Sequence, residues 1–538
     1  MHRASFTKEG FVVDPFARET YPASIRVIDG AIASIDRLAP EASRRELPFI
    51  VPCFVDAHGH PEATLVSPIE YARAALANGV AAAVIDPHEI ANVLGSEGLA
   101  FFHDHFAGMP FRFACGAPSS AGLSLAEIEF LLDRPMITHL SEVMDFPGVI
   151  LGTSSALPAI RLALARGKPI DGHAPGISGE NLLALARAGI STDHECVSLE
   201  DARAKADAGI SVQIRFGVRG NGDALLPLIS SHPDRAMLCS DGPDPRFLAG
   251  GYIADSVRRA LAADNSVYDV VRSASVNPVE HYRIPLGLVR PGDSADFLCV
   301  DGPETMGVRE VYVGGERVYD GTAVCVGDRR FPPIVAMGSA PIGEGDLSVP
   351  VRPGLLRVIE AYDGEHITGL SERAPRTEGA FAVADLDRDI LKLVLLNRYV
   401  PSRPIVAFVR GFGLRRGAIA TSVSHDRHHI LAVGSDDRSI VRAVNRVVEA
   451  RGGMVCADAD SVVAELELAI AGLVGTMTVP ETVGRVEGLA RSAAALGCVF
   501  RYPFETLSYL AMDVFPELKI TEGGLRSPRE AGPISLFR

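Results

Sequence analysis

The stretch Val51-Pro52-Cys53-Phe54-Val55-Asp56-Ala57-His58-Gly59-His60 decides how the rest of the chain is interpreted. Residues 49–55 are apolar, partly β-branched and too few for a helix, so they predict a buried strand. Side chains alternate along a strand, so His58 and His60 are expected to point to the same side. Two imidazoles at the end of a buried strand can bind one metal ion. A loop that merely carries two histidines is the alternative at this point.

Length and composition set the broad class of the protein. A chain of 538 residues is too long for one compact core, so two or three domains are expected. The net charge of −15 argues against a nucleic-acid-binding surface and favours a small-molecule substrate. The 8 cysteines are scattered without a Cys-x-x-Cys pair, which favours a reducing, cytoplasmic location. No signal-peptide pattern is present, and no run approaches the roughly 18 apolar residues of a membrane span.

Between residues 51 and 282, short apolar segments alternate with amphipathic stretches rich in Ala and Leu. About eight such alternations predict a (β/α)8 barrel, in which catalytic groups lie at the C-terminal ends of the strands. The candidate strands are 49–55, 80–85, 111–115, 136–140, 169–172, 190–193, 210–214 and 236–240. The candidate helices are 68–78, 124–132, 155–166, 178–188, 198–207 and 253–263.

The segments on either side of the barrel region have a different pattern. Residues 1–50 contain apolar runs around Asp29-Gly30, which is a hairpin signal, and residues 283–345 return to short β-like runs. We expect these two segments to form one small β unit. Residues 337–354 are rich in Gly, Pro and Ser and predict a linker. The remainder, 346–538, predicts an α+β domain with strands at 380–385, 393–397, 405–410, 418–423, 430–434 and 462–466, and helices at 438–450 and 481–495.

Side chains that can bind metal or transfer protons follow six of the candidate strands. If the barrel is correct, they converge on one mouth, where imidazole and carboxylate suit a divalent metal such as Zn, Fe or Mn. Two such ions would lower the pKa of a water, and a neighbouring carboxylate could carry its proton, which describes hydrolysis of a carbon–nitrogen bond. The residues are His58, His60, His88, Glu89, Glu142, His173, His194, Glu195 and Asp241. We expect the other histidines (His2, His103, His105, His139, His232, His281, His366) to be surface or packing residues, apart from a cluster at 425–429.

Several longer stretches are similar to one known family. They are Phe54–His60, Asp86–Gly95, Glu142–Val149, Asp171–Gly176 and Asp193–Cys196, with Ser422–Asp426, Val444–Arg446 and Leu473 in the C-terminal domain. In these runs the chain resembles the adenine deaminases of the amidohydrolase superfamily. The resemblance implies a metal-bearing barrel, a flanking β-sandwich made from residues 1–50 and 283–345, an additional C-terminal domain, and an assembly of two or four copies. It implies that the metal ligands are His58, His60, His173, His194, the bridging Glu142, and Asp241, which would also shuttle protons.

The chain departs from the family pattern around this ligand set. The family usually has two adjacent acids followed by Arg-His-Pro where this chain has Ser240-Asp241-Gly242-Pro243-Asp244-Pro245. It usually has Arg-Glu-Gly-Ser where this chain has Arg215-Phe216-Gly217-Val218, and Ile-Glu-Ser-Ser where this chain has residues 61–64 (Pro-Glu-Ala-Thr). The metal set is kept while the pocket wall is changed. A site that recognises its substrate through polar contacts loses affinity when those contacts are removed.

The leading hypothesis is deamination of adenine or a related aminopurine, with water, to hypoxanthine and ammonia. A metal-bound hydroxide would attack the ring carbon, with Asp241, Glu142 and His194 as catalytic residues. The alternatives are hydrolysis of another nitrogen heterocycle, such as a cyclic amide or ureide, and a non-catalytic metal-binding relative. His88 and Glu89 either touch substrate or support a ligand, and Glu195 either orients His194 or caps a helix. His425 belongs either to a lid or to a polar turn. The predicted substrate-binding residues are His88, Glu89, Phe216 and His425.

Overall fold

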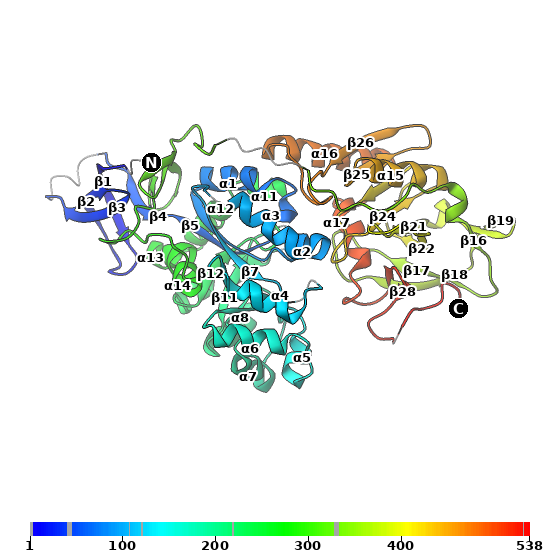
Figure 1. Cartoon of the computed structure of the whole chain (residues 1–538), viewed down its shortest axis with the longest axis horizontal. Coiled ribbons are helices and arrows are strands. Elements are labelled where there is room, and N and C mark those ends of the chain that lie inside the picture. Colours follow the sequence, from blue (N-terminus) through cyan, green and yellow to red (C-terminus); the bar gives the residue numbers. More distant parts are fainter. Residues whose placement is uncertain are drawn as a thin grey trace. The chain divides into compact units, whose positions relative to one another are not determined.

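The computed structural model describes residues 4–39, 46–106, 108–119, 122–217, 220–327, 333–530 and 532–538. The chain divides into two compact units (Figure 1). The first takes in the residues up to 64, then 68–91 and 95–330, and the second takes in 65–67, 92–94 and 331–538.

The first unit contains a nearly closed eight-stranded barrel. Its strands are parallel and lie side by side in the order of the sequence. A parallel bridge between Gly59 and Asp241 joins the first strand to the end of the last, where the His60 N–H donates to the Asp241 carbonyl at 2.8 Å. The predicted barrel is confirmed. The strands are β5(Phe54–Gly59), β6(Val80–Ile85), β7(Arg112–Ala117), β8(Ile137–Val143), β9(Ile170–Gly172), β10(Thr192–Asp193), β11(Ser211–Arg215) and β12(Ala236–Cys239).

Helices follow the barrel strands, and several begin where the sequence signals them. Ser124 accepts the Glu127 N–H in a capping box, and Ser198 accepts the Asp201 N–H, which satisfies amides that have no partner inside the helix. The helices are α1(Pro68–Ala77), α2(His88–Leu94), α3(Ser96–Phe106), α4(Leu125–Leu132), α5(Phe146–Leu151), α6(Leu157–Ala165), α7(Gly179–Ala188), α8(Leu199–Asp207), α9(Gly222–Leu225), α10(Pro227–Ser231), α11(Pro245–Ala249), α12(Tyr252–Ala262), α13(Val267–Val271) and α14(Asn277–Tyr282).

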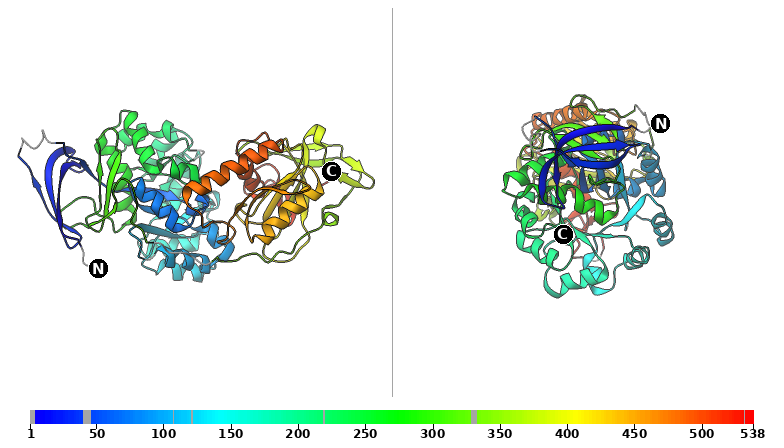
Figure 2. Two further views of the ribbon diagram at one scale, coloured as in Figure 1. Left: turned by 90° about the horizontal axis from the view of Figure 1, so that it is seen from above. Right: turned by 90° about the vertical axis from the view of Figure 1, so that its left-hand side faces the viewer.

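The predicted single strand 49–55 is two strands, which corrects the sequence prediction. β4(Phe49–Pro52) ends at Pro52, which has no N–H to donate, and β5 begins after Cys53. β4 pairs with β1, which precedes the barrel in the sequence, and with β13, which follows it. The sheet is ordered β15-β14-β13-β4-β1-β2-β3. Figure 2 shows the curvature of its N-terminal strands in dark blue. The other strands are β1(Phe6–Asp14), β2(Glu19–Ile28), β3(Ala31–Arg37), β13(Phe297–Val300), β14(Val308–Val313) and β15(Glu316–Tyr319).

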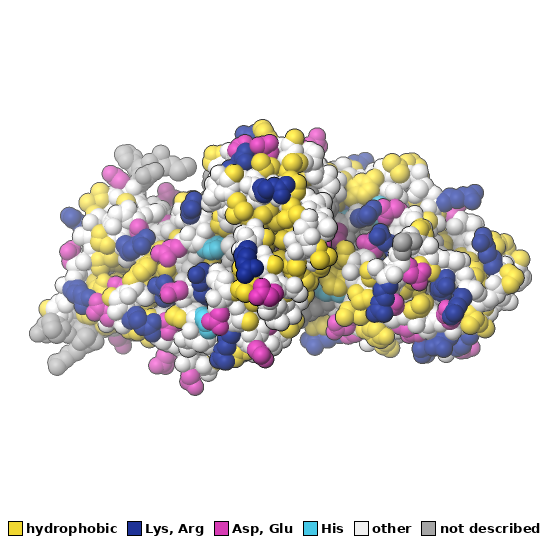
Figure 3. Space-filling view, turned by 90° about the horizontal axis from the view of Figure 1, so that it is seen from below, with side chains coloured by type: hydrophobic (Ala, Val, Ile, Leu, Met, Phe, Trp, Pro, Cys, Tyr) yellow, Lys and Arg dark blue, Asp and Glu magenta, His cyan; other side chains and the backbone are white. Residues whose placement is uncertain are grey.

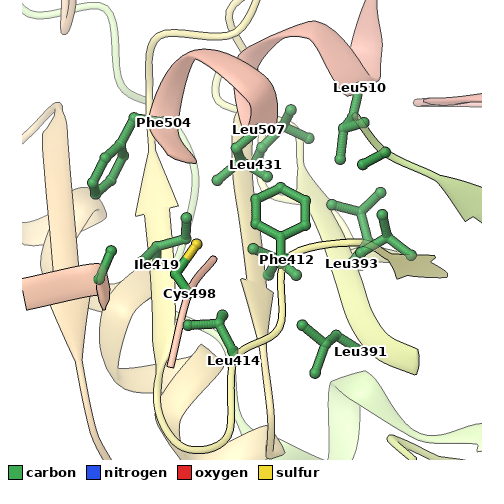
Figure 4. Close-up of a cluster of buried hydrophobic side chains, with 14 of the residues drawn as sticks. Leu391, Leu393, Phe412, Leu414, Ile419, Leu431, Cys498, Phe504, Leu507 and Leu510 are labelled. Carbon is green, nitrogen blue, oxygen red and sulfur yellow. The ribbon is translucent and has the colours of Figure 1, made fainter. Parts of the chain in front are cut away.

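The second unit is built on another eight-stranded sheet, ordered β18-β17-β22-β21-β24-β23-β25-β26. Alternate residues of β21 face opposite sides: Leu393 packs with α16 and α17 residues, and Val394 packs with α15 residues. The first of these cores includes Phe412, Leu431 and Leu507 (Figure 4). The elements are β17(Leu356–Glu360), β18(Gly369–Arg373), β21(Ile390–Leu396), β22(Ile405–Arg410), β23(Ala418–Thr421), β24(Ile430–Gly434), β25(Gly453–Ala457), β26(Val462–Glu467), α15(Asp437–Glu449), α16(Val479–Ala495) and α17(Pro503–Ser508).

The predicted linker is more ordered than its composition indicates. It contains a 3-10 turn at Glu344–Leu347 and the strand β16(Val349–Pro350), and the Ile342 N–H donates to Asn445 Oδ1 at 2.8 Å. The sequence also missed β25, because its first residue, Gly453, reads as a turn residue.

Within the described residues, no helix is long and apolar enough to cross a membrane. On the face drawn in Figure 3, acidic and basic side chains are intermixed.

Candidate metal centre

The barrel brings the six predicted ligands to one end of its strands. His58 lies near the end of β5, and Glu142 lies near the end of β8. Asp241 is the second residue after the end of β12. His60, His173 and His194 each follow the last residue of a strand. Asp241 has a φ of +61°, a left-handed conformation that Asp tolerates better than most residues and that occurs at functional sites.

Glu142 lies between two sets of histidines. Its Oε2 is 2.9 Å from His173 Nδ1 and 3.3 Å from His194 Nε2. Its Oε1 is 3.8 Å from His60 Nε2 and 3.7 Å from His88 Nδ1. One carboxylate therefore presents a different oxygen to each set, which is the arrangement that a bridging ligand between two ions requires.

Asp241 and His60 are oriented by groups outside the ligand set. The His60 Nδ1–H donates to the Asp86 carbonyl at 2.9 Å, which leaves Nε2 to face Asp241 Oδ1 at 3.2 Å. Asp241 Oδ1 also lies 3.8 Å from His58 Nε2. Arg215 Nη1 donates to Asp241 Oδ2 at 2.7 Å and to Glu195. Asp241 therefore has one oxygen held by a cation and the other turned to the histidines.

The structure adds Asp86 to the candidate ligands and joins His88 to the centre. Asp86 Oδ2 is 3.2 Å from His88 Nδ1, and ligand atoms of these two residues lie within 4.8 Å of those of His60 and Glu142. The sequence could have pointed to Asp86, because it directly follows the strand predicted at 80–85. His139, expected to be a packing residue, is fully buried with Nε2 3.4 Å from Asp171 Oδ2.

The electrostatics of the centre favour a cation. Burial alone lowers the pKa of His60, but its contact with Asp241 and the charge of Glu142 outweigh burial and raise the pKa to about 10. Burial likewise opposes protonation of His173, while its hydrogen bond with Glu142 raises that pKa to about 9. Burial lowers the pKa of His194. The carboxylates thus concentrate negative charge where protons and metal ions compete for the same imidazole nitrogens.

Several buried ligand atoms make no hydrogen bond within the described residues. They include both ring nitrogens of His58, Nδ1 of His194 and Oδ1 of Asp86. Buried polar atoms are usually paired, and an unpaired one is costly unless another group satisfies it. Imidazole nitrogens and carboxylate oxygens are donors that divalent Zn, Fe and Mn accept. The donor set therefore fits the metal ions that the sequence predicts.

Comparison with known proteins identifies the family. Residues 49–318 match the model of the amidohydrolase family, and residues 365–530 match that of the adenine deaminase C-terminal domain. An adenine deaminase of Salinibacter ruber is 43% identical, covering 97% of each chain. One of Sulfurovum sp. is 41% identical over 95% of this chain and 96% of its own, and one of Methanosarcina mazei is 37% identical over 98% and 99%. The chain belongs to the adenine deaminase family of amidohydrolases. Its members are metal-dependent hydrolases that act on carbon–nitrogen bonds.

In this family member, a buried lysine joins the loops that carry two of the histidines. Lys205 of α8 is fully buried, and its Nζ donates to the Ala174 carbonyl at 2.8 Å and to Asp193 Oδ1 at 3.1 Å. Asp193 also accepts the N–H groups of Ala174 and Glu195, each at 2.8 Å. Ala174 follows His173, and Asp193 precedes His194. Lys205 and Asp193 therefore fix the two loops to each other.

A second buried network lies behind His58 and Asp241. Asp56 accepts the Ser240 N–H at 2.9 Å and is also hydrogen-bonded by the hydroxyls of Ser240 and Tyr252. Burial raises the pKa of Asp56 to about 6, although these hydrogen bonds oppose the rise. Because Asp56 and Ser240 each lie close in sequence to a predicted ligand, the network ties the first strand of the barrel to the last.

The remaining predicted residues lie in different surroundings. Glu89 Oε1 is 3.7 Å from His88 Nε2, and Glu195 is paired with Arg215. The buried Phe216 ring packs against Gly222 and lies 4.9 Å below the Arg259 guanidinium. His425 lies in the second unit, where its ring stacks on Tyr509 with centroids 5.8 Å apart. Substrate binding by His88, Glu89, Phe216 and His425 stays a prediction.

Proposed function

We propose that this protein hydrolyses adenine to hypoxanthine and ammonia with two divalent ions at the centre around Glu142. The position of this carboxylate between two sets of histidines carries the proposal. The relatives named adenine deaminase, which match over nearly the whole chain, support the choice of substrate.

The other five predicted ligands divide into two sets around Glu142. His58, His60 and Asp241 would hold one ion, His173 and His194 would hold the other, and Glu142 would serve both. When bound, such ions lower the pKa of a water and so supply a nucleophile near neutral pH. Mn, Fe and Zn all suit these donors, and the number and identity of the ions are part of the proposal.

Asp241 is the residue best placed to move the proton. Arg215 holds its Oδ2, so Oδ1 is the atom turned to the reaction centre. Oδ1 would take a proton from the attacking water as the new carbon–oxygen bond forms at the amine-bearing carbon. It would then give that proton to the amine as the carbon–nitrogen bond breaks, and ammonia would leave.

A second candidate keeps this chemistry and changes the ring, to a cyclic amide or ureide. The altered wall favours it: an ideal Cβ on Gly242 would lie 3.8 Å from Ala63 Cβ, so two positions that depart from the family pattern are neighbours. Both residues are small and lack polar side-chain atoms.

Ammonia release separates the candidates. The protein is purified with Mn, Fe or Zn, its metal content is measured, and ammonia is followed with adenine, other aminopurines and cyclic amides. His58→Ala should lose metal and activity, while His103→Ala, which changes a half-exposed histidine on α3, should lose neither. Turnover of another ring without adenine would favour the second candidate, and full metal occupancy without any turnover would contradict both.

Two further predictions concern the state of the protein. We propose an assembly of two or four copies and a cytoplasmic location. Light scattering of the purified protein and fractionation of the source cells test them.

A further inference from the structure

A group of four buried side chains extends the centre beyond the six predicted ligands. Asp86 directly follows β6 and His88 begins α2, so one short turn carries both. Their ligand atoms and those of His60 and Glu142 all lie within 4.8 Å of one another. Among the described residues, this is the largest such group of side chains that can bind metal. Neither Asp86 nor His88 has a place in the two-ion centre proposed above.

The backbone of Asp86 is held firmly, while part of its side chain has no partner. The Asp86 N–H donates to the Gly59 carbonyl at 3.0 Å, and the Asp86 carbonyl accepts the His60 Nδ1–H at 2.9 Å. The residue is 1% exposed, and its Oδ1 makes no hydrogen bond to any described residue. A buried polar atom is costly unless another group compensates it, so a missing partner is expected here.

His88 and Asp86 face each other as two ligands of one ion would. His88 Nδ1 lies 3.2 Å from Asp86 Oδ2, yet this nitrogen makes no hydrogen bond within the described part of the chain. An ion pair between protonated His88 and Asp86 is the alternative, and at this distance it would normally be hydrogen-bonded. Two ligands of one ion lie close together without a hydrogen bond, because each directs a lone pair at the metal.

The spacing of the other donors also fits one ion. Donors about 2.1 Å from a tetrahedral ion lie about 3.4 Å from one another. Glu142 Oε1 is 3.7 Å from His88 Nδ1 and 3.8 Å from His60 Nε2. Each carboxylate oxygen has two lone pairs, so Glu142 can serve this position as well as the two-ion centre. The one lone pair of His60 Nε2 serves a single ion, which leaves Asp86, His88 and Glu142 as the donors.

The charges around the His88 ring favour a further cation. Three buried carboxyl groups approach this ring: Asp86 at 3.2 Å, and Glu89 and Glu142 at 3.7 Å. Within the described residues, no Lys or Arg forms an ion pair with Asp86 or Glu142. Two ions in the proposed centre would balance Glu142 and leave Asp86 with only an imidazole beside it. A buried charge without such compensation is strongly unfavourable.

We propose that Asp86, His88 and Glu142 bind a third divalent cation, and that this ion is Mn(II). The inference rests on the two-ion centre of the proposed function and assigns no reaction step to the added ion. Two of the three donors are carboxylates, which suit Mn(II), and water would complete its coordination. Imidazole suits Zn(II), so the centre that offers two histidines to each ion should fill with Zn(II) first.

Zinc and manganese together count the sites. The metal-free protein is loaded with two equivalents of Zn(II), its zinc content is checked by elemental analysis, and Mn(II) is then added. Free Mn(II) is followed by its EPR signal, to which Zn(II) does not contribute. The unaltered protein should bind one Mn(II) and keep both Zn(II) ions, since such donors bind Zn(II) more tightly than Mn(II). This measurement needs no variant and so does not depend on how a mutant folds.

Two variants assign the Mn(II) to the proposed donors. Asp86→Asn and His88→Asn should each lose the bound Mn(II) and keep both Zn(II) ions. The controls are Asp104→Asn and His103→Asn, which change exposed residues of α3 and should keep all three ions. Far-UV circular dichroism checks that each variant is folded.

The outcomes separate this inference from the proposed function. If the unaltered protein binds fewer than two Zn(II) ions, the two-ion centre itself is wrong. If it holds two Zn(II) ions and binds no Mn(II), the third site is wrong while the two-ion centre stands. If either Asp86→Asn or His88→Asn still binds the Mn(II) as tightly as its control, the ion does not lie at the proposed donors and the inference is overturned.

Discussion

Replacing Lys205 with Met should both destabilise the barrel and loosen its metal site. The Lys205 side chain is fully buried, and its Nζ donates to the Ala174 carbonyl, Asp193 Oδ1 and, at 3.4 Å, Asp201 Oδ2. Met has a similar length and no charge, so the change leaves the apolar packing of α8 nearly intact. What it removes is the only cation in direct contact with these two carboxylates among the described residues.

The size of the effect follows from that geometry. Removing one partner of a buried ion pair leaves the other charge uncompensated, which costs about 3–5 kcal/mol in the free energy of unfolding. The loops that carry His173 and His194 also lose their common anchor. Groups that orient metal ligands typically change metal affinity by about 10- to 100-fold when they are removed. Lys205→Met should therefore lose its metal at a chelator concentration about 10- to 100-fold lower than the unaltered protein requires.

The pH dependence of the difference has a defined sign. Burial lowers the pKa of Lys205, but Asp193 and Asp201 outweigh burial and raise it above its usual value. The stabilisation is therefore fully present below the unfolded pKa of about 10.4 and is lost as the pH rises through the higher folded value. The stability gap between the unaltered protein and Lys205→Met should be constant near neutral pH and shrink above about pH 10.4.

Calorimetry measures the unfolding transitions of both proteins. Because α8 belongs to the barrel, hydrogen exchange of its amides identifies which transition is the unfolding of the barrel. Arg187→Met is the control, because Arg187 is an exposed residue of α7 whose substitution should change stability by no more than about 0.5 kcal/mol. The reasoning is refuted if Lys205→Met unfolds like this control and holds its metal equally well. A loss of stability with unchanged metal retention would refute the anchoring role alone.

Three shorter predictions concern the metal site and the second unit. His58→Ala should purify with less metal than the unaltered protein, as elemental analysis would measure; equal metal content would remove His58 from the ligand set. Gly472→Ala should lower the melting temperature, because the new Cβ would lie 2.0 Å from Arg398 Nη2 at a backbone φ of +67°, and unchanged melting would contradict this packing. Phe412→Ala, at a fully buried position, should cost about 3–5 kcal/mol in denaturant unfolding, and a loss below about 1 kcal/mol would show that the core collapses around it.

The barrel and the convergence of the six candidate ligands on one end of it were predictable because their signal is local and repeated. Each ligand lies near the end of a short apolar segment, and parallel strands bring such ends together whatever the details of the helices between them. His58 and His194 could therefore be placed at one centre without knowing any distance between them. The alternation of strands and helices is sufficient for this step.

The groups around the ligands could not be predicted, because they depend on side-chain direction. Arg215 and Phe216 are neighbours at the end of β11, and the sequence drew attention to Phe216 as a changed position. The structure turns Arg215 to Asp241 and packs Phe216 against Gly222 and Arg259. Adjacent residues at a strand end point in different directions, so a shift of one position changes which side chain faces the centre. The pattern of a single sequence does not determine that direction.

Two of the departures from the family pattern are neighbours in space. Ala63 and Gly242 lie on different loops, yet a Cβ on Gly242 would be in van der Waals contact with Ala63. The two changes therefore alter one patch of wall beside Asp241. Neither side chain has a polar atom, so this patch cannot hydrogen-bond a ring through its side chains. Recognition of a purine must then depend on the polar groups that remain around the candidate ligands.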